Sequence, residues 1–82
     1  MDELLAILET ASVAGTFCGL VVTRAASKIM LMQDLAVRVD DPLVLARAVR
    51  AADDMLSAHR WRRIEPWHWG AGGAAYAMVE PL

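Results

Sequence analysis

The stretch TASVAGTFCGLVVTR, residues 10–24, decides how the first half of the chain is interpreted. It has no charged residue before Arg24, and Gly15 and Gly19 stand four residues apart, the GxxxG spacing at which helices approach closely. Such a run is typical either of half a transmembrane helix or of the closest contact between two helices in water. The residues on either side of this stretch help to choose between these two interpretations.

Residues 2–36 fit one long amphipathic helix. On a helical wheel the polar residues Glu9, Thr16, Thr23 and Asp34 fall on one side, and the apolar residues form one uninterrupted sector on the other. The pattern continues for about nine turns, which corresponds to a helix roughly 45 Å long. The apolar sector consists of Leu4, Ile7, Leu8, Ala11, Ala14, Gly15, Cys18, Val21, Val22, Ala25, Ile29, Met32 and Ala36.

A membrane span over residues 4–23 is the alternative. The mean hydropathy of this range is near the transmembrane threshold, and the cations that follow it would leave the C-terminus in the cytoplasm, at the inner membrane. However, the uncharged run is shorter than the roughly 20 residues that a span needs. The polar stripe also continues well past the supposed membrane edge. We therefore expect a helix-packing seam in an aqueous protein, formed by Ala11, Gly15, Cys18 and Val22.

A second helix is expected over residues 42–61. Asp41 and Pro42 suit an N-cap and a first helical residue, and the basic cluster HRWRR at 59–63 complements the C-terminal dipole. A short break between two amphipathic helices favours an antiparallel hairpin. The Trp/Gly-rich segment 65–82 would then be a short β-hairpin or an irregular tail. The sequence thus predicts one small, mainly α domain over residues 1–82.

Composition indicates that something outside the chain covers part of its surface. Hydrophobic residues make up 57% of the 82 residues, more than a lone domain of this size can readily bury. The net charge of −2 offers no overall attraction to nucleic acid, and the single Cys18 excludes an intrachain disulfide. The acidic N-terminus does not resemble an export signal, so we expect a cytoplasmic location. Abundant Ala and Arg favour a bacterial or phage source.

The residues that often carry chemistry form no recognisable set here. His59 and His68 have no nucleophile or carboxylate at a catalytic spacing, and with one distant cysteine they suggest no metal ligands. The acidic pairs at 40–41 and 53–54 are interpreted as surface charges. We therefore expect no catalytic residue, no metal and no cofactor.

Aromatic and arginine side chains gather near the C-terminus and are the best candidates for partner contact. Trp, Tyr and Arg dominate binding hot spots. Burial of the aromatic rings within the protein, as a lid over the helices, is an equal alternative. In the membrane interpretation, the same rings would be anchors at the membrane interface. The candidate residues are Arg60, Trp61, Arg62, Trp67 and Trp69.

These observations predict a non-enzymatic protein–protein interaction module. It would be a self-associating subunit, or an accessory or inhibitory protein of phage or mobile-element origin, whose partner is another protein or a second copy. The single-pass membrane protein is the second interpretation. A small nucleic-acid-binding protein that uses the basic cluster at 59–63 is the third, and the nearby acids Asp53, Asp54 and Glu65 count against it.

Overall fold

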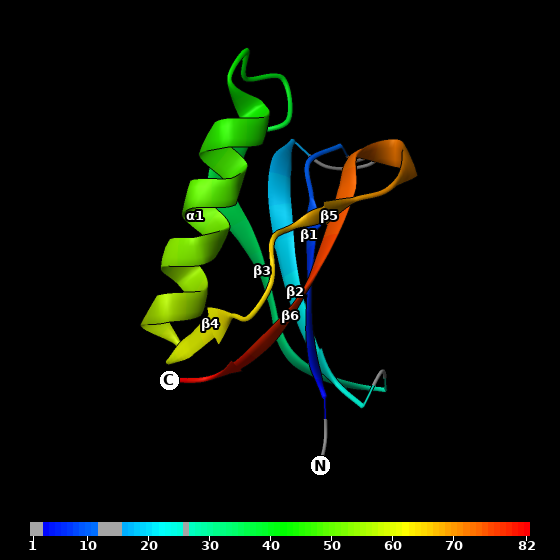
Figure 1. The fold of residues 1–82 in the computed structure, drawn as a ribbon. Coiled ribbons are helices and arrows are strands. Elements are labelled where there is room, and N and C mark those ends of the chain that lie inside the picture. The colour runs from blue at the N-terminus through cyan, green and yellow to red at the C-terminus, as the bar shows by residue number, and fades with distance from the viewer. Residues whose placement is uncertain (1–2, 12–15, 26) are drawn as a thin grey trace.

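The computed structural model describes residues 3–11, 16–25 and 27–82, which form a curled antiparallel sheet with one helix (Figure 1). A 3₁₀ turn, Ala71–Gly73, precedes the last strand. The elements are β1 (Leu4–Glu9), β2 (Phe17–Arg24), β3 (Lys28–Arg38), α1 (Val44–Ala58), β4 (Trp61–Arg63), β5 (His68–Trp69) and β6 (Ala74–Pro81).

The strands lie in the order β3-β2-β1-β6-β4, and β5 pairs with β6. All pairs are antiparallel. Helix α1 contacts both β3 and β4, the two strands at opposite ends of this order, so the sheet curls around the helix (Figure 1). One face of the sheet therefore packs on α1, and the other face turns away from it.

The prediction of a mainly α helical hairpin is wrong, because the described part of residues 2–36 consists of β1, β2 and β3. In β1 and β2 burial alternates along the chain, as it does in a strand with one buried face. Leu8 and Val22 are fully buried in the core, whereas Ile7 and Val21, which the helical wheel placed in the same apolar sector, lie on the other face of the sheet. Apolar residues on both faces thus imitated one helical stripe.

The membrane span and the helix-packing seam both depended on a helix over this range. The described residues of 4–23 belong to two strands and the segments flanking them. Of the seam residues, Ala11 is exposed, Cys18 and Val22 point from β2 into the core, and Gly15 lies outside the described residues. In the described ranges no helix has the length and apolar character needed to cross a membrane.

The helix expected over residues 42–61 forms over Val44–Ala58 and packs on the sheet instead of on another helix. Leu43 occupies the N-cap position, but Asp41 still holds this end: its carboxylate accepts the Leu43 N–H at 2.8 Å and Arg47 Nη1 at 2.8 Å. Ala48 and Ala52 are fully buried, and these small side chains bring the helix backbone close to the strands.

The C-terminal segment forms the β5–β6 hairpin, one of the two arrangements that the sequence left open. Its turn contains Gly72 and Gly73, both with positive φ, which glycine adopts without strain. The Thr10 hydroxyl donates to the Gly73 carbonyl at 2.7 Å, and the Thr10 N–H donates to the same oxygen at 2.9 Å. This turn is therefore tied to the end of β1.

Candidate functional site

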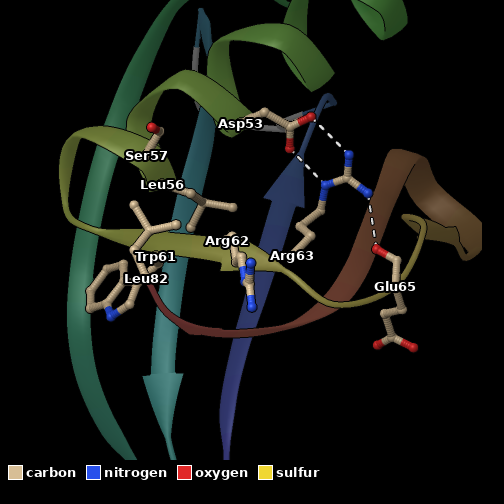
Figure 2. A pocket seen from close by; sticks show the side chains of 8 residues that line it. All are labelled: Asp53, Leu56, Ser57, Trp61, Arg62, Arg63, Glu65 and Leu82. Carbon is tan, nitrogen blue, oxygen red and sulfur yellow. Dashed lines mark hydrogen bonds and ion pairs between the residues drawn. The ribbon is translucent and has the colours of Figure 1, made fainter.

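Asp53 of α1 is the centre of the best-connected polar cluster among the described residues. Its carboxylate accepts two hydrogen bonds from Arg63, Nε at 2.7 Å and Nη2 at 2.8 Å, and one from the Trp67 indole N–H at 3.2 Å. The third nitrogen of Arg63 donates to the Glu65 carbonyl at 2.9 Å (Figure 2). The guanidinium also lies 5.4 Å from the centre of the Trp67 ring. This cluster joins the helix to the segment after β4.

Local structure brings these side chains together. The chain turns back after α1 at Arg60, which has a positive φ of 63°, and enters β4 beside β6. Glu65 then fixes the following segment, because its carboxylate accepts the Met78 N–H at 2.7 Å and contacts His68 Nε2 at 3.0 Å. The Met78 N–H, followed by His68, lowers the pKa of Glu65. The hydrogen bonds from Arg63 to Asp53 raise the pKa of Arg63 against the opposing effect of burial.

A cavity of about 400 Å³ lies between α1, β4 and the C-terminal residue. Its two cations are both paired: Arg63 with Asp53, and Arg62 with Glu80 at 2.7 Å. An anion entering it would compete with carboxylates that already hold these guanidinium groups. The lining side chains, shown in Figure 2, are Asp53, Leu56, Ser57, Trp61, Arg62, Arg63, Glu65 and Leu82.

The five residues expected to contact a partner do not form one surface. Trp61 and Trp67 are half-buried and pack against the core. Arg62 is engaged by Glu80, and Arg60 is exposed at the turn. Trp69 is 44% exposed on β5 and stands apart from the cavity lining. The structure thus gives the two half-buried tryptophans structural contacts, while their part in binding stays a prediction.

A second surface, which the sequence interpretation missed, is the face of the sheet turned away from α1. Cross-strand pairs place its apolar side chains side by side: Ile7 is opposite both Val21 and Tyr76, and Val21 is also opposite Met32. We call this surface the outer face. It consists of Leu5, Ile7, Val21, Thr23, Ile29, Met32, Tyr76 and Met78.

The outer face contains no charged side chain. Met32 is 66% exposed, Ile29 55% and Tyr76 43%, and the other members are half-buried by their neighbours. Glu9 and Asp34 border it at one end, on either side of Gly19, and these three residues line a hollow of about 520 Å³. Continuous apolar surfaces are in general more common at interaction sites than elsewhere on protein surfaces.

The sequence does contain a signal for this surface. In both LLAILE and FCGLVVTR the residues of either parity are largely apolar, which is typical of a strand buried on both faces. For the Asp53 cluster no comparable signal exists, since ten residues and a change of direction separate Asp53 from Arg63.

Comparison with protein-family models, curated proteins and solved structures finds no match to this chain. Within the part of the chain that the structure describes, no three His, Cys, Asp or Glu side chains gather as metal ligands would. The Asp53 cluster and the outer face are therefore the features from which a function can be inferred.

Proposed function

We propose that this chain is a non-enzymatic protein–protein interaction module whose binding surface is the outer face of its sheet. The observation that carries the proposal is the row Met32, Val21, Ile7 and Tyr76, which runs across four neighbouring strands without a charge. Covering apolar surface stabilises a complex by about 25 cal/mol per Å² before the costs of association are subtracted.

Sheet geometry supports this assignment. An antiparallel sheet with one face in the core commonly keeps polar residues on the other face. Here the other face is apolar as well, and its most exposed side chain, Met32, is an unbranched thioether that adapts to irregular partners. Such a pattern favours a sheet that packs between two layers, α1 on one face and a partner on the other.

The Asp53 cluster has a different part in this proposal. Its donors and acceptors are already paired with one another. The cluster therefore holds α1 to the β4–β5 segment and makes the sheet more rigid from the α1 side. A rigid sheet loses little conformational entropy on binding, which favours affinity. The cluster is thus a support for the binding surface.

A comparison of two matched variants tests the proposal. Met32→Glu introduces a charge on the outer face, whereas Leu45→Glu introduces the same charge at a similarly exposed leucine of α1. Tagged forms of the chain and of both variants would be incubated with a bacterial lysate and with an untagged copy, and the bound proteins quantified by mass spectrometry. We expect a bound protein that Met32→Glu loses and Leu45→Glu retains. The same bound set for all three forms would refute the proposal.

A further inference from the structure

We infer that the partner of the outer face is a basic amphipathic helix of another protein, which lies along β1 and carries lysines or arginines at both ends of its apolar stripe. This inference rests on the proposed function and gives the chemistry of the partner at the same surface. It is carried by the carboxylates at the two ends of the outer face, by a hollow beside Gly19 and by the curvature of the sheet.

Carboxylates border the outer face at both ends of its strands. Glu9 and Asp34 lie at one end, and Glu3, directly before β1, lies at the other. All three residues are exposed, and none of them is in an ion pair with a described residue. The apolar surface is therefore framed by negative charge, which a partner with cations in the same places would complement.

The hollow between Glu9 and Asp34 has room for one cationic side chain. Gly19 lies between these two residues in the cross-strand row, and a Cβ added to it would lie 4.0 Å from the nearest atom beyond its two chain neighbours. With strands about 4.8 Å apart, the two acidic residues are roughly 10 Å from each other. A lysine or arginine that enters the hollow would lay its aliphatic stem on Val21 and Met32 and place its charge between the carboxylates.

The opposite end of the outer face has a second hollow, of about 680 Å³, to which Glu3, Met78 and Glu80 contribute. Glu80 is paired with Arg62 at 2.7 Å. Arg24 also lines this hollow and is engaged in an interaction of its own. Glu3 is therefore the carboxylate at this end that a partner's cation would meet, and the stronger attraction lies at the Gly19 end.

The shape of the sheet favours a helix as the partner. The sheet curls around α1, so the outer face is convex across its strands, and a partner that lies along one strand keeps more contact than a flat surface does (Figure 1). Glu3 and Glu9 are six residues apart, roughly 20 Å along an extended chain, which corresponds to about 13 residues of helix. A helix pairs its own backbone groups, whereas an extended segment would leave them unpaired against apolar side chains.

The same charges argue against other occupants of the outer face. A second copy of this chain would bring carboxylates toward carboxylates at both ends, whichever way its strands run. DNA or an anionic lipid surface would bring phosphates toward them. A basic segment of another protein supplies the opposite charge at each end.

Two synthetic peptides of about 16 residues, titrated into the purified chain by calorimetry, test this inference. Both would form an amphipathic helix with a leucine stripe, one with two lysines at each end and the other with two glutamates there. At low salt the lysine peptide should bind with a Kd about tenfold or more below that of the glutamate peptide. The difference should shrink to less than about threefold in roughly 0.5 M salt, because salt screens exposed charges.

Matched variants show whether the peptide meets the outer face. Asp34→Lys and Asp54→Lys change the net charge equally, but Asp54 is exposed on α1. Asp34→Lys should raise the Kd of the lysine peptide about threefold or more, and Asp54→Lys should change it by less than about twofold. Met32→Ser, which removes an apolar contact without adding charge, should weaken both peptides about threefold or more, and Leu45→Ser on α1 should weaken neither. Circular dichroism melting shows whether each variant is folded.

The other outcomes separate this inference from the proposed function. Equal Kd values for the two peptides overturn the inference, while the proposed function stands if Met32→Ser weakens both. Equal weakening by Asp34→Lys and Asp54→Lys indicates general attraction to an acidic chain and also overturns it. Binding to duplex DNA or to phosphatidylglycerol vesicles in place of the lysine peptide overturns it as well.

Two results bear on both claims. If neither peptide binds, the inference is wrong, and the proposed function then stands only if the lysate comparison gives a bound protein that Met32→Glu loses. Peptide binding that Met32→Ser leaves unchanged places the contact elsewhere on the chain and contradicts both.

Discussion

Ile7 of β1 lies directly opposite Val21 of β2 on the outer face, while the next residue, Leu8, is fully buried on the other side of the same strand. The two neighbours therefore face different surroundings, although a helical wheel placed them in one sector. Ile7→Ala should lower the free energy of unfolding by about 1 kcal/mol and Leu8→Ala by about 3 kcal/mol. Urea unfolding at low micromolar concentration measures both, and equal losses would contradict the strand assignment.

Asp53 connects three partners, so its removal should destabilise the fold. Asp53→Ala leaves Arg63 and the Trp67 indole without their acceptor, and we expect a loss of roughly 1–2 kcal/mol, because the pair is about a third exposed and partly screened. The exposed neighbour Asp54 is the matched control, and Asp54→Ala should change stability by less than about 0.5 kcal/mol. Similar urea midpoints for the two variants would show that the cluster does not support the sheet.

Trp67 gives a second test of the same cluster. Its ring is half-buried against the core and lies under Arg63. Trp67→Ala should cost about 2 kcal/mol, less than the loss for a fully buried tryptophan. The corresponding change at the exposed Trp69 should cost less than about 1 kcal/mol. If thermal melts showed no loss for Trp67→Ala, partner contact would be the better account of this residue.

The thiol of Cys18 should be unreactive in the folded protein. Cys18 is fully buried in β2, and burial raises the pKa of its thiol, so little thiolate is available. Labelling with a thiol reagent at neutral pH should be slow in buffer and fast above the urea midpoint. Rapid labelling in native conditions would mean that β2 does not face the core.

Glu65 should contribute stability that depends on pH. The Met78 N–H and His68 hold its pKa below the ordinary value of 4.5, so the unfolded chain binds the proton more readily than the folded chain. The contribution is present above that value and is lost as the pH falls through the lowered pKa. The difference in urea midpoint between the chain and Glu65→Gln should therefore shrink from pH 6 to pH 3; a difference that is constant over this range would contradict the contact.

Part of the fold could be predicted from the sequence. The helix over Val44–Ala58 has a narrow apolar stripe with charges on its other side, and only a helix buries such a stripe on one face. The glycines at 72 and 73 marked the turn before β6. Both signals are local, and therefore sequence reasoning could use them.

The strands could not be distinguished in the same way. A period of two is visible only when one face is polar, and β1 and β2 carry apolar residues on both faces. The Gly15/Gly19 spacing then favoured a helix, although Gly19 is a strand residue opposite Glu9. The outer face was missed for the same reason: it joins residues of four strands, and sequence spacing alone does not place them together.

The central claim is that the outer face, and not the Asp53 cluster or α1, is the surface that binds. A titration with the lysine peptide followed by two-dimensional amide NMR tests it most directly, because each backbone amide reports its own surroundings. We predict peptide-dependent shifts at Ile7, Val21, Met32 and Tyr76, and none at Ala48, Asp53 or Leu56. Shifts confined to α1 and the Asp53 cluster would contradict the claim that the outer face is the surface that binds.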